Sequence, residues 1–192
     1  MNESDISQKG MSDLSSFDNS WYQPGGSVVK RVLWYLTNAI LFKSSWFLLG
    51  SLKVSILRAF GAKIGKGLII KPCVNIKYPW RLSIGDHCWI GENVWIDNLA
   101  DVTIDNHVCL SQGAMLLTGN HNYKVSSFDL MIGEIQLEDG AWIGAQTTVC
   151  PGITIGSHAV LSVGSVATSD LEPSWMYQGV PAEKRKKRVI ES

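Results

Sequence analysis

Several features of secreted and membrane-spanning proteins are missing from this chain of 192 residues. It has no Cys-x-x-Cys pair, and its four cysteines fall at different positions of the repeat described below, so no disulfide framework is expected. The first residues are polar and do not resemble a secretory leader. The longest uncharged runs in the apolar stretch 28–60, residues 32–42 and 44–52, are shorter than the roughly 20 residues of a bilayer-spanning helix. We therefore expect a reduced, cytoplasmic protein with structural thiols.

Long stretches of the chain also lack charges of one sign. The formal net charge is zero, yet no acid occurs between Asn19 and Gly85, where there are ten bases. From Asp86 to Glu183 there are twelve acids and one base, and five consecutive bases follow at 184–188. Such segregation favours a surface that meets an anion, such as lipid headgroups, a phosphorylated carrier or a nucleotide cofactor.

The periods of an ordinary helix or strand, 3.6 and 2 residues, do not run through most of the sequence. Instead, aliphatic residues return at every sixth position, with two eight-residue steps and one longer interruption. They are Ile64, Ile70, Ile76, Ile84, Ile90, Ile96, Ile104, Leu110, Leu116, Leu137, Ile143, Val149, Ile155 and Leu161. Hexapeptide repeats have this pattern, because three hexads form one triangular coil and stacked coils bury a column of aliphatic side chains.

The repeat divides the chain into four parts. Residues 1–20 are rich in Ser, Asp and Asn and are predicted to be disordered, and residues 21–61 form a helical segment that breaks near 43–45. Residues 62–168 form the coil stack, with an excursion at about 117–136, and residues 169–192 form an extension with a basic tail. The helical segment is expected to cap one end of the stack, to lie on an anionic membrane, or both.

Three of the four histidines share one position of the repeat. His87, His107 and His158 each follow a core aliphatic by three residues, and His87 and His107 are one coil apart, so we expect them to stack on the exterior. Two stacked histidines suggest a metal site, but no third ligand shares their column. We interpret all three as exposed turn residues, and no metal is expected.

His121 differs because it lies at the start of the excursion, where a side chain can project from the stack. Counting back twenty residues places Asp101 one coil below it. A carboxylate beside an imidazole holds its tautomer and raises its basicity. His121 and Asp101 are therefore the candidate catalytic pair.

At this point the chain resembles a known family. The segments IGDHCWIGENVWI, LLTGNHNY, DGAWIGAQTTVCPGITIGSHAVLSVGSVATSDL and YQGVPAEK are similar to the hexapeptide-repeat acyltransferases, and the segments FDNSWYQPG and KYPWRLSIGDH are similar to the colanic-acid-type exopolysaccharide acetyltransferases within that family. The likeness covers about residues 17–188. It implies an all-β fold, a left-handed parallel β-helix with an N-terminal helical segment and a short C-terminal tail.

The resemblance also implies a chemistry. The family's catalytic base corresponds to His121, which would take the proton of an acceptor hydroxyl as its oxygen attacks an acetyl thioester. A backbone N–H at the Gly144–Ala145 step, supplied across a subunit interface, would stabilise the oxyanion. The implied co-substrate is acetyl-CoA, and the implied assembly is a homotrimer with active sites at its clefts.

Residues that would contact the substrates follow from the same resemblance. The coenzyme groove maps onto Trp142, Gly144, Ala145, Val163, Gly164, Ala167 and Thr168. Glu183 stands where a basic residue is common, so Lys184 is expected to make the contact to the 3′-phosphate. Asp97 and Asn98 align with the family's acceptor-contacting pair, although both residue types also favour turns. Asn120, beside His121, is added to the acceptor set.

These observations predict an acetyl-CoA-dependent O-acetyltransferase that acts on a sugar hydroxyl in exopolysaccharide or surface-polysaccharide synthesis, without nucleic acid as a partner. The alternatives are an N-acyltransferase on an amino sugar, a carbonic anhydrase on the same scaffold, and a non-catalytic β-helix at a membrane. The basic segment 19–85 adds the hypothesis of a polyprenyl-diphosphate-linked acceptor and peripheral contact with the inner membrane face. A nucleotide-linked acceptor remains open.

Overall fold

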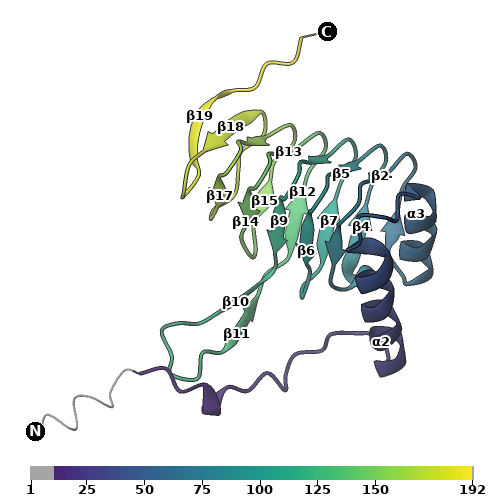
Figure 1. Ribbon diagram of the computed structural model, residues 1–192. Coiled ribbons are helices and arrows are strands. Elements are labelled where there is room, and N and C mark those ends of the chain that lie inside the picture. The colour runs from purple at the N-terminus through teal and green to yellow at the C-terminus, as the bar shows by residue number, and fades with distance from the viewer. Residues whose placement is uncertain (1–10, 192) are drawn as a thin grey trace, which may run out of the picture.

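The computed structural model describes residues 11–191. Residues 1–10, the first half of the segment predicted to be disordered, and Ser192 lie outside this range. A stack of triangular coils forms the body (Figure 1), with two helices at one end, a long hairpin projecting from the middle and two longer strands at the other end. The fold class expected from the sequence is confirmed.

Each coil contributes one short strand to each of three sheets, and the strands of successive coils pair in parallel. Face A contains β1 (Lys63–Ile64), β4 (Leu82–Ile84), β7 (Val102–Ile104), β12 (Ile135–Leu137) and β15 (Thr154–Ile155). Face B contains β2 (Ile69–Ile70), β5 (Trp89–Ile90), β8 (Cys109–Leu110), β13 (Trp142–Ile143), β16 (Val160–Leu161), β18 (Trp175–Gln178) and β19 (Glu183–Lys187). Face C contains β3 (Asn75–Ile76), β6 (Trp95–Asp97), β9 (Met115–Leu117), β14 (Thr148–Val149) and β17 (Val166–Ala167).

The strand register confirms the period of the repeat. Ile64 pairs with Ile84, and Ile84 pairs with Ile104, so the first coils advance by twenty residues. Leu137 pairs with Ile155, which is the eighteen-residue coil of three pure hexads. Apart from Ile64, every repeat aliphatic is at most 5% exposed. The column of aliphatic side chains read from the sequence is therefore the core.

A left-handed backbone conformation explains where the exterior histidines fall. His87, His107 and His158 have φ of 55°, 58° and 58°. The same position three residues after the core aliphatic is glycine in several other hexads, because a side chain is rarely tolerated at positive φ. The rings of His87 and His107 stack with their centroids 5.5 Å apart. Their interpretation as stacked turn residues is confirmed.

Two helices cover the first coil. They are α2 (Val28–Thr37), which continues as the π-helix η2 (Asn38–Phe42), and α3 (Gly50–Ala59). The Ser27 hydroxyl caps α2 by accepting from the backbone of Lys30. Trp34, Phe42 and Leu57 are at most 1% exposed and join the aliphatic core. The predicted capping of the stack is therefore confirmed, and none of the helices within residues 11–191 has the length and apolarity to cross a bilayer.

The excursion is an antiparallel hairpin of β10 (Gly119–His121) and β11 (Leu130–Ile132). It leaves the coil after β9 on face C and returns at β12 on face A, so it projects from the corner between these faces (Figure 1). Residues 11–26 run beside it, with one 3₁₀ turn at η1 (Leu14–Ser16) and a hydrogen bond of 2.8 Å from the Asp13 N–H to the Ser126 carbonyl. This half of the segment predicted to be disordered is thus placed against the hairpin. A second 3₁₀ turn, η3 (Pro79–Arg81), precedes β4.

The C-terminal extension is more ordered than the expected tail. Its strand β18 adds to face B beside β16, and β19 folds back antiparallel to β18, so the basic residues 184–187 form a strand. The Arg188 guanidinium donates to the carbonyls of Gly140 and His158, at 2.9 and 3.2 Å. These contacts fix the extension to two successive coils.

Shortening one core side chain should destabilise the stack. Leu110→Ala removes three buried carbon atoms and leaves a cavity among packed neighbours, so we expect a loss of about 2–5 kcal/mol in unfolding free energy. The matched control, Leu48→Ala, changes a side chain that is 71% exposed and should leave stability within about 0.5 kcal/mol. Denaturant titrations followed by circular dichroism measure both. Equal losses in the two variants would contradict the assignment of the core.

Candidate active site

His121 ends β10, and its imidazole is held by the opposite side of the hairpin. The Nδ1 atom lies 2.8 Å from the Phe128 carbonyl oxygen, and the two rings stack with centroids 4.4 Å apart. Phe128 has a φ of 54°, an uncommon conformation for a bulky residue. Since a carbonyl only accepts hydrogen bonds, Nδ1 must carry the proton. The lone pair of Nε2 is then free to accept a proton from a substrate.

A pocket opens beside this imidazole. It is lined by Phe17, Asn19, Tyr22, Pro24, Lys77, Tyr78, Leu99, His121 and Leu130. The Phe17 ring centroid lies 5.6 Å from that of His121, and the Tyr22 hydroxyl donates to the Leu99 carbonyl at 2.8 Å. Burial, with a smaller contribution from Tyr78, raises the pKa of Tyr22 to about 12. Tyr22 therefore remains a neutral hydrogen-bond donor that holds the N-terminal segment over the pocket.

The predicted pairing of Asp101 with His121 is wrong. Asp101 forms an ion pair of 3.1 Å with Arg81, the residue one coil below it, and the backbone carbonyl of Phe128 takes the place beside His121 Nδ1. Counting by twenty fails here because His121 has already left the coil path. The tautomer is fixed by a carbonyl, which sequence reasoning could not identify because any residue supplies one.

The predicted acceptor role of Asn98 is also wrong. Its side chain is fully buried and is saturated by backbone groups: Oδ1 accepts from the Tyr78 N–H at 2.9 Å, and Nδ2 donates to the carbonyls of Tyr78 and Arg81, at 2.7 and 3.2 Å. Asn98 thus binds the backbone of the eight-residue step between Ile76 and Ile84, in the preceding coil. This corresponds to the turn role weighed for it in the sequence.

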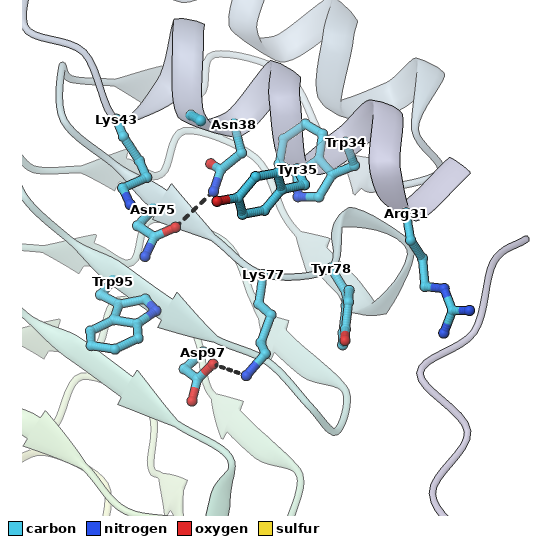
Figure 2. A pocket seen from close by; sticks show the side chains of 11 residues that line it. Arg31, Trp34, Tyr35, Asn38, Lys43, Asn75, Lys77, Tyr78, Trp95 and Asp97 are labelled. Carbon is cyan, nitrogen blue, oxygen red and sulfur yellow. Dashed lines mark hydrogen bonds and ion pairs between the residues drawn. The ribbon is translucent and has the colours of Figure 1, made fainter. Parts of the chain in front are cut away.

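The two other predicted acceptor residues lie close to open space. Asp97 ends β6, is 9% exposed, and forms an ion pair with Lys77 in which Oδ1 and Nζ are 2.9 Å apart. The pair lines a second pocket, under α2 (Figure 2). Asn120 is exposed, and its Oδ1 accepts from the backbone N–H of His121 at 2.8 Å. Asn120 therefore shapes the strand end that carries the imidazole.

Four of the predicted coenzyme residues line one groove on the outside of face B, and a fifth, Gly164, follows it in the chain. Trp142, Gly144, Ala145, Val163 and Gly164 lie along β13 and the turn after β16, and the first four line a pocket with Ser111 and Met176. The indole N–H of Trp142 donates to Ser111 Oγ at 2.9 Å.

The other predicted coenzyme residues lie elsewhere. Ala167 is completely buried in the core, so it cannot contact a ligand. Thr168 follows it on face C, away from the groove. Lys184 contacts Glu172 as an ion pair and lies 3.9 Å from the centre of the Trp175 ring. In this chain the Lys184 ammonium is thus already engaged, and a contact with the 3′-phosphate would have to compete with both partners.

The hydrogen-bond ladder narrows the predicted oxyanion donor to one residue. The Gly144 N–H donates to the Leu161 carbonyl at 2.8 Å, so it is part of the coil-to-coil ladder. Within residues 11–191, no acceptor is found for the next N–H, that of Ala145. Of the two N–H groups at the Gly144–Ala145 step, that of Ala145 is therefore the one that can donate to a ligand.

One chain does not bring the base and the groove together. The hairpin with His121 projects from the corner between faces C and A, whereas the groove lies on face B, on the opposite side of the triangular prism.

The side chains that bind metals do not gather in this structure. No cluster of three His, Cys, Asp or Glu side chains that could hold a metal ion occurs within residues 11–191, and the four cysteines are unpaired thiols. A carbonic anhydrase needs three converging histidines. The three turn histidines instead sit on the exterior, apart from His121.

Comparisons with known proteins agree with this architecture. No protein-family model matches the chain. The putative colanic acid biosynthesis acetyltransferase WcaF of Escherichia coli K12 is 35% identical over 179 residues, which span 93% of this chain and 98% of that protein. A hexapeptide-repeat acetyltransferase of Vibrio cholerae, solved with acetyl coenzyme A, superposes with a TM-score of 0.76 at 23% identity, covering 84% of this chain and 88% of that one. A maltose O-acetyltransferase of Clostridium difficile gives 0.76 at 22% identity, covering 85% and 88%.

The two solved structures show the shared fold, and the similarity to WcaF extends over nearly the whole of both proteins. The predicted enzyme class, an acyltransferase, is confirmed by the relationship to this acetyltransferase. The chain belongs to the hexapeptide-repeat acetyltransferases, in the group that includes the colanic acid biosynthesis enzyme.

Proposed function

We propose that this protein transfers an acetyl group from acetyl-CoA to a sugar hydroxyl during the synthesis of an exopolysaccharide or surface polysaccharide. The observation that carries the proposal is the His121 imidazole, which lines a pocket and whose Nδ1 is held by the Phe128 carbonyl at 2.8 Å, so that Nε2 is left free. Relatives named for acetylation in colanic acid synthesis and for galactoside O-acetylation support a sugar acceptor.

The reaction follows from this arrangement. Nε2 of His121 takes the hydroxyl proton as the acceptor oxygen forms a bond to the thioester carbonyl carbon. The resulting oxyanion accepts a hydrogen bond from the Ala145 N–H, and collapse of the tetrahedral intermediate breaks the carbon–sulfur bond. The proton on His121 then passes to the departing thiolate, which restores the neutral imidazole. Transfer is direct, without a covalent enzyme intermediate.

A homotrimer completes the site. His121 and Ala145 lie on opposite sides of one chain, so the donor N–H and the coenzyme groove come from a neighbouring copy. Trp89, Trp95 and Trp142 are 40–55% exposed on faces B and C, and aromatic side chains of this kind are enriched in subunit interfaces. Three copies around one axis give three equivalent clefts.

Peripheral contact with the inner face of the cytoplasmic membrane is part of the proposal. The helical segment exposes many large apolar side chains: Val28, Val29, Val32, Leu33, Leu36, Ile40, Trp46, Leu48 and Leu49, each at least 48% exposed. No acid occurs in this segment, whereas Lys30, Arg31 and Lys43 do. Apolar side chains flanked by bases alone are typical of segments that lie on anionic lipid.

Removing the imidazole should stop turnover without unfolding the coil. His121→Ala loses the general base, which contributes on the order of 10²–10⁴ in rate, so we expect kcat to fall by that factor. The control, His107→Asn, changes a turn histidine at positive φ to a residue that tolerates this conformation. Thiol release from acetyl-CoA with a panel of glycans measures both. Full activity of His121→Ala would overturn the assigned base.

Substitutions at two neighbouring residues should have different effects, one on acceptor binding and the other on stability. Asp97→Asn weakens a charged hydrogen-bond acceptor near the site, so the KM for the acceptor should rise about tenfold. Asn98→Ala leaves buried backbone groups of Tyr78 and Arg81 without partners, so the unfolding free energy should fall by about 1–3 kcal/mol. Kinetics and thermal unfolding distinguish them. A raised KM in Asn98→Ala at unchanged stability would restore its acceptor role.

Lipid binding should depend on charge and on the exposed helix face. The protein should float with vesicles that contain anionic phospholipid and remain in the lower fraction with neutral vesicles, because bases near a negative surface contribute about 1 kcal/mol each. Replacing Val32 and Leu33 by Ser should reduce flotation, whereas replacing the distant Val163 by Ser should not. Flotation that is indifferent to lipid charge would contradict the membrane contact.

A further inference from the structure

A second cavity adjoins the His121 pocket, between the first helix and face C. Figure 2 shows α2 and η2 above it and strands of face C below it, with Arg31 and Lys43 at its two ends in this view and Lys77 on its floor. Trp34, Tyr35, Asn38, Ala39, Asn75, Tyr78, Trp95 and Asp97 complete the lining. We call this cavity the cationic pocket.

The π-helix fixes the upper wall of the cationic pocket. Asn38 begins η2 and is 8% exposed, and its Nδ2 donates to Asn75 Oδ1 on β3 at 2.7 Å. Trp34, one turn earlier, donates from its indole N–H to the Ile76 carbonyl at 2.9 Å. Short π-helical turns occur frequently at functional sites. The wall that carries Arg31 and Lys43 is therefore locked onto face C at two points.

The charge of the lining is unbalanced. It contains three bases and, among these described residues, one acid, Asp97. Lys77 is already paired with Asp97 at 2.9 Å, whereas Arg31 and Lys43 have no carboxylate within ion-pair distance anywhere in residues 11–191. Two positive charges thus border a concave space without an internal counterion. Such an arrangement favours a ligand with at least one negative charge.

The cationic pocket adjoins the pocket that contains His121. Lys77 and Tyr78 line both this pocket and the one that contains His121. A molecule that spans the shared wall has one end at the imidazole and the other between α2 and face C. Trp95 and Tyr78 offer aromatic faces along this path, and the Asp97 carboxylate offers an acceptor for sugar hydroxyls but repels an anion placed next to it.

We propose that the acceptor is a sugar that carries a phosphate or diphosphate, with the anionic group bound by Arg31 and Lys43 and the sugar directed past Lys77 to His121. The Lys77–Asp97 pair then contacts the sugar, because pairing with Lys77 offsets the repulsion of the carboxylate. This inference rests on the proposed acetyl transfer for the role of His121, but the binding of the anion does not depend on it.

Two sources can supply such a group: a polyprenyl diphosphate or a nucleotide diphosphate. The helix that carries Arg31 also exposes Val28, Val32 and Leu36, which places apolar surface beside the cationic pocket. A lipid chain leaving the pocket on this side meets this apolar surface, which suits an acyl or prenyl chain better than a polar nucleoside. The geometry therefore favours the lipid-linked source.

Calorimetric titration of the full-length protein with inorganic diphosphate, in the absence of acetyl-CoA, tests the pocket. Arg31→Gln and Lys43→Gln should each raise the Kd about tenfold, the effect of losing one charge-assisted hydrogen bond. Lys66→Gln is the matched control, since it removes an exposed base from the same acid-free segment outside the pocket. All three variants should keep the wild-type affinity for CoA and the wild-type melting temperature.

The outcomes separate this inference from the proposed function. Absence of diphosphate binding, or an equal weakening in the Lys66→Gln control, overturns the pocket even if acetyl transfer is established. Diphosphate binding that depends on Arg31 and Lys43 supports the pocket even if no acetyl transfer is found. Competition with farnesyl diphosphate and with UDP distinguishes the two sources. Tighter binding of farnesyl diphosphate supports the lipid-linked acceptor, and tighter binding of UDP supports a nucleotide-linked one. Failure of both to compete with diphosphate overturns the proposal.

Discussion

The vertical register between coils is the constraint on which the rest of the structure depends. Each coil donates backbone hydrogen bonds to the next, as from Gly65 to Ile84 and from Gly85 to Ile104. The fit is so close that a Cβ atom on Gly85 would lie 2.8 Å from the backbone of Asp105. A prism stacked at this spacing has few degrees of freedom. Any segment that leaves it starts and ends at fixed points.

The hairpin uses these fixed points to position the imidazole. It departs at Thr118, whose fully buried hydroxyl donates to the Asp97 carbonyl and accepts from the Ala100 N–H, and it rejoins the ladder at Ile135. Between them, the Phe128 carbonyl selects the tautomer of His121. An imidazole that lines a pocket with its tautomer fixed thus results from backbone geometry at both ends of the excursion and at its tip.

Much of the fold could be predicted from the sequence because the repeat is a local rule that is applied many times. The period of six and the helical cap each follow from side-chain volume and burial. The errors arose where the chain departs from this rule. Asp101 was assigned to His121 by extending the count of twenty into a segment that has left the coil, and Asn98 was read as a ligand contact although its amide holds neighbouring backbone. Phe128 was missed because it acts through its carbonyl.

The site itself is distributed over elements that are distant in the sequence. The N-terminal segment contributes Phe17 and Tyr22, the helical cap contributes Arg31 and Lys43 to the adjoining cationic pocket, and the proposed groove for the coenzyme lies on another face. Composition indicated that the basic segment meets an anion, but only the packing of α2 on face C turns separate bases into a concave pocket. In the proposed trimer, the remaining predicted contacts come from a neighbouring copy.

A crystal structure of the complex with CoA tests the central claim most directly. The account predicts that the pantetheine arm follows the groove of Trp142 and Val163 on one copy, with its sulfur within roughly 3–3.5 Å of the site where an acceptor oxygen would contact His121 Nε2 of the next copy. A sulfur bound far from every His121, or an Nε2 that is turned into the hairpin with Nδ1 exposed, would contradict it.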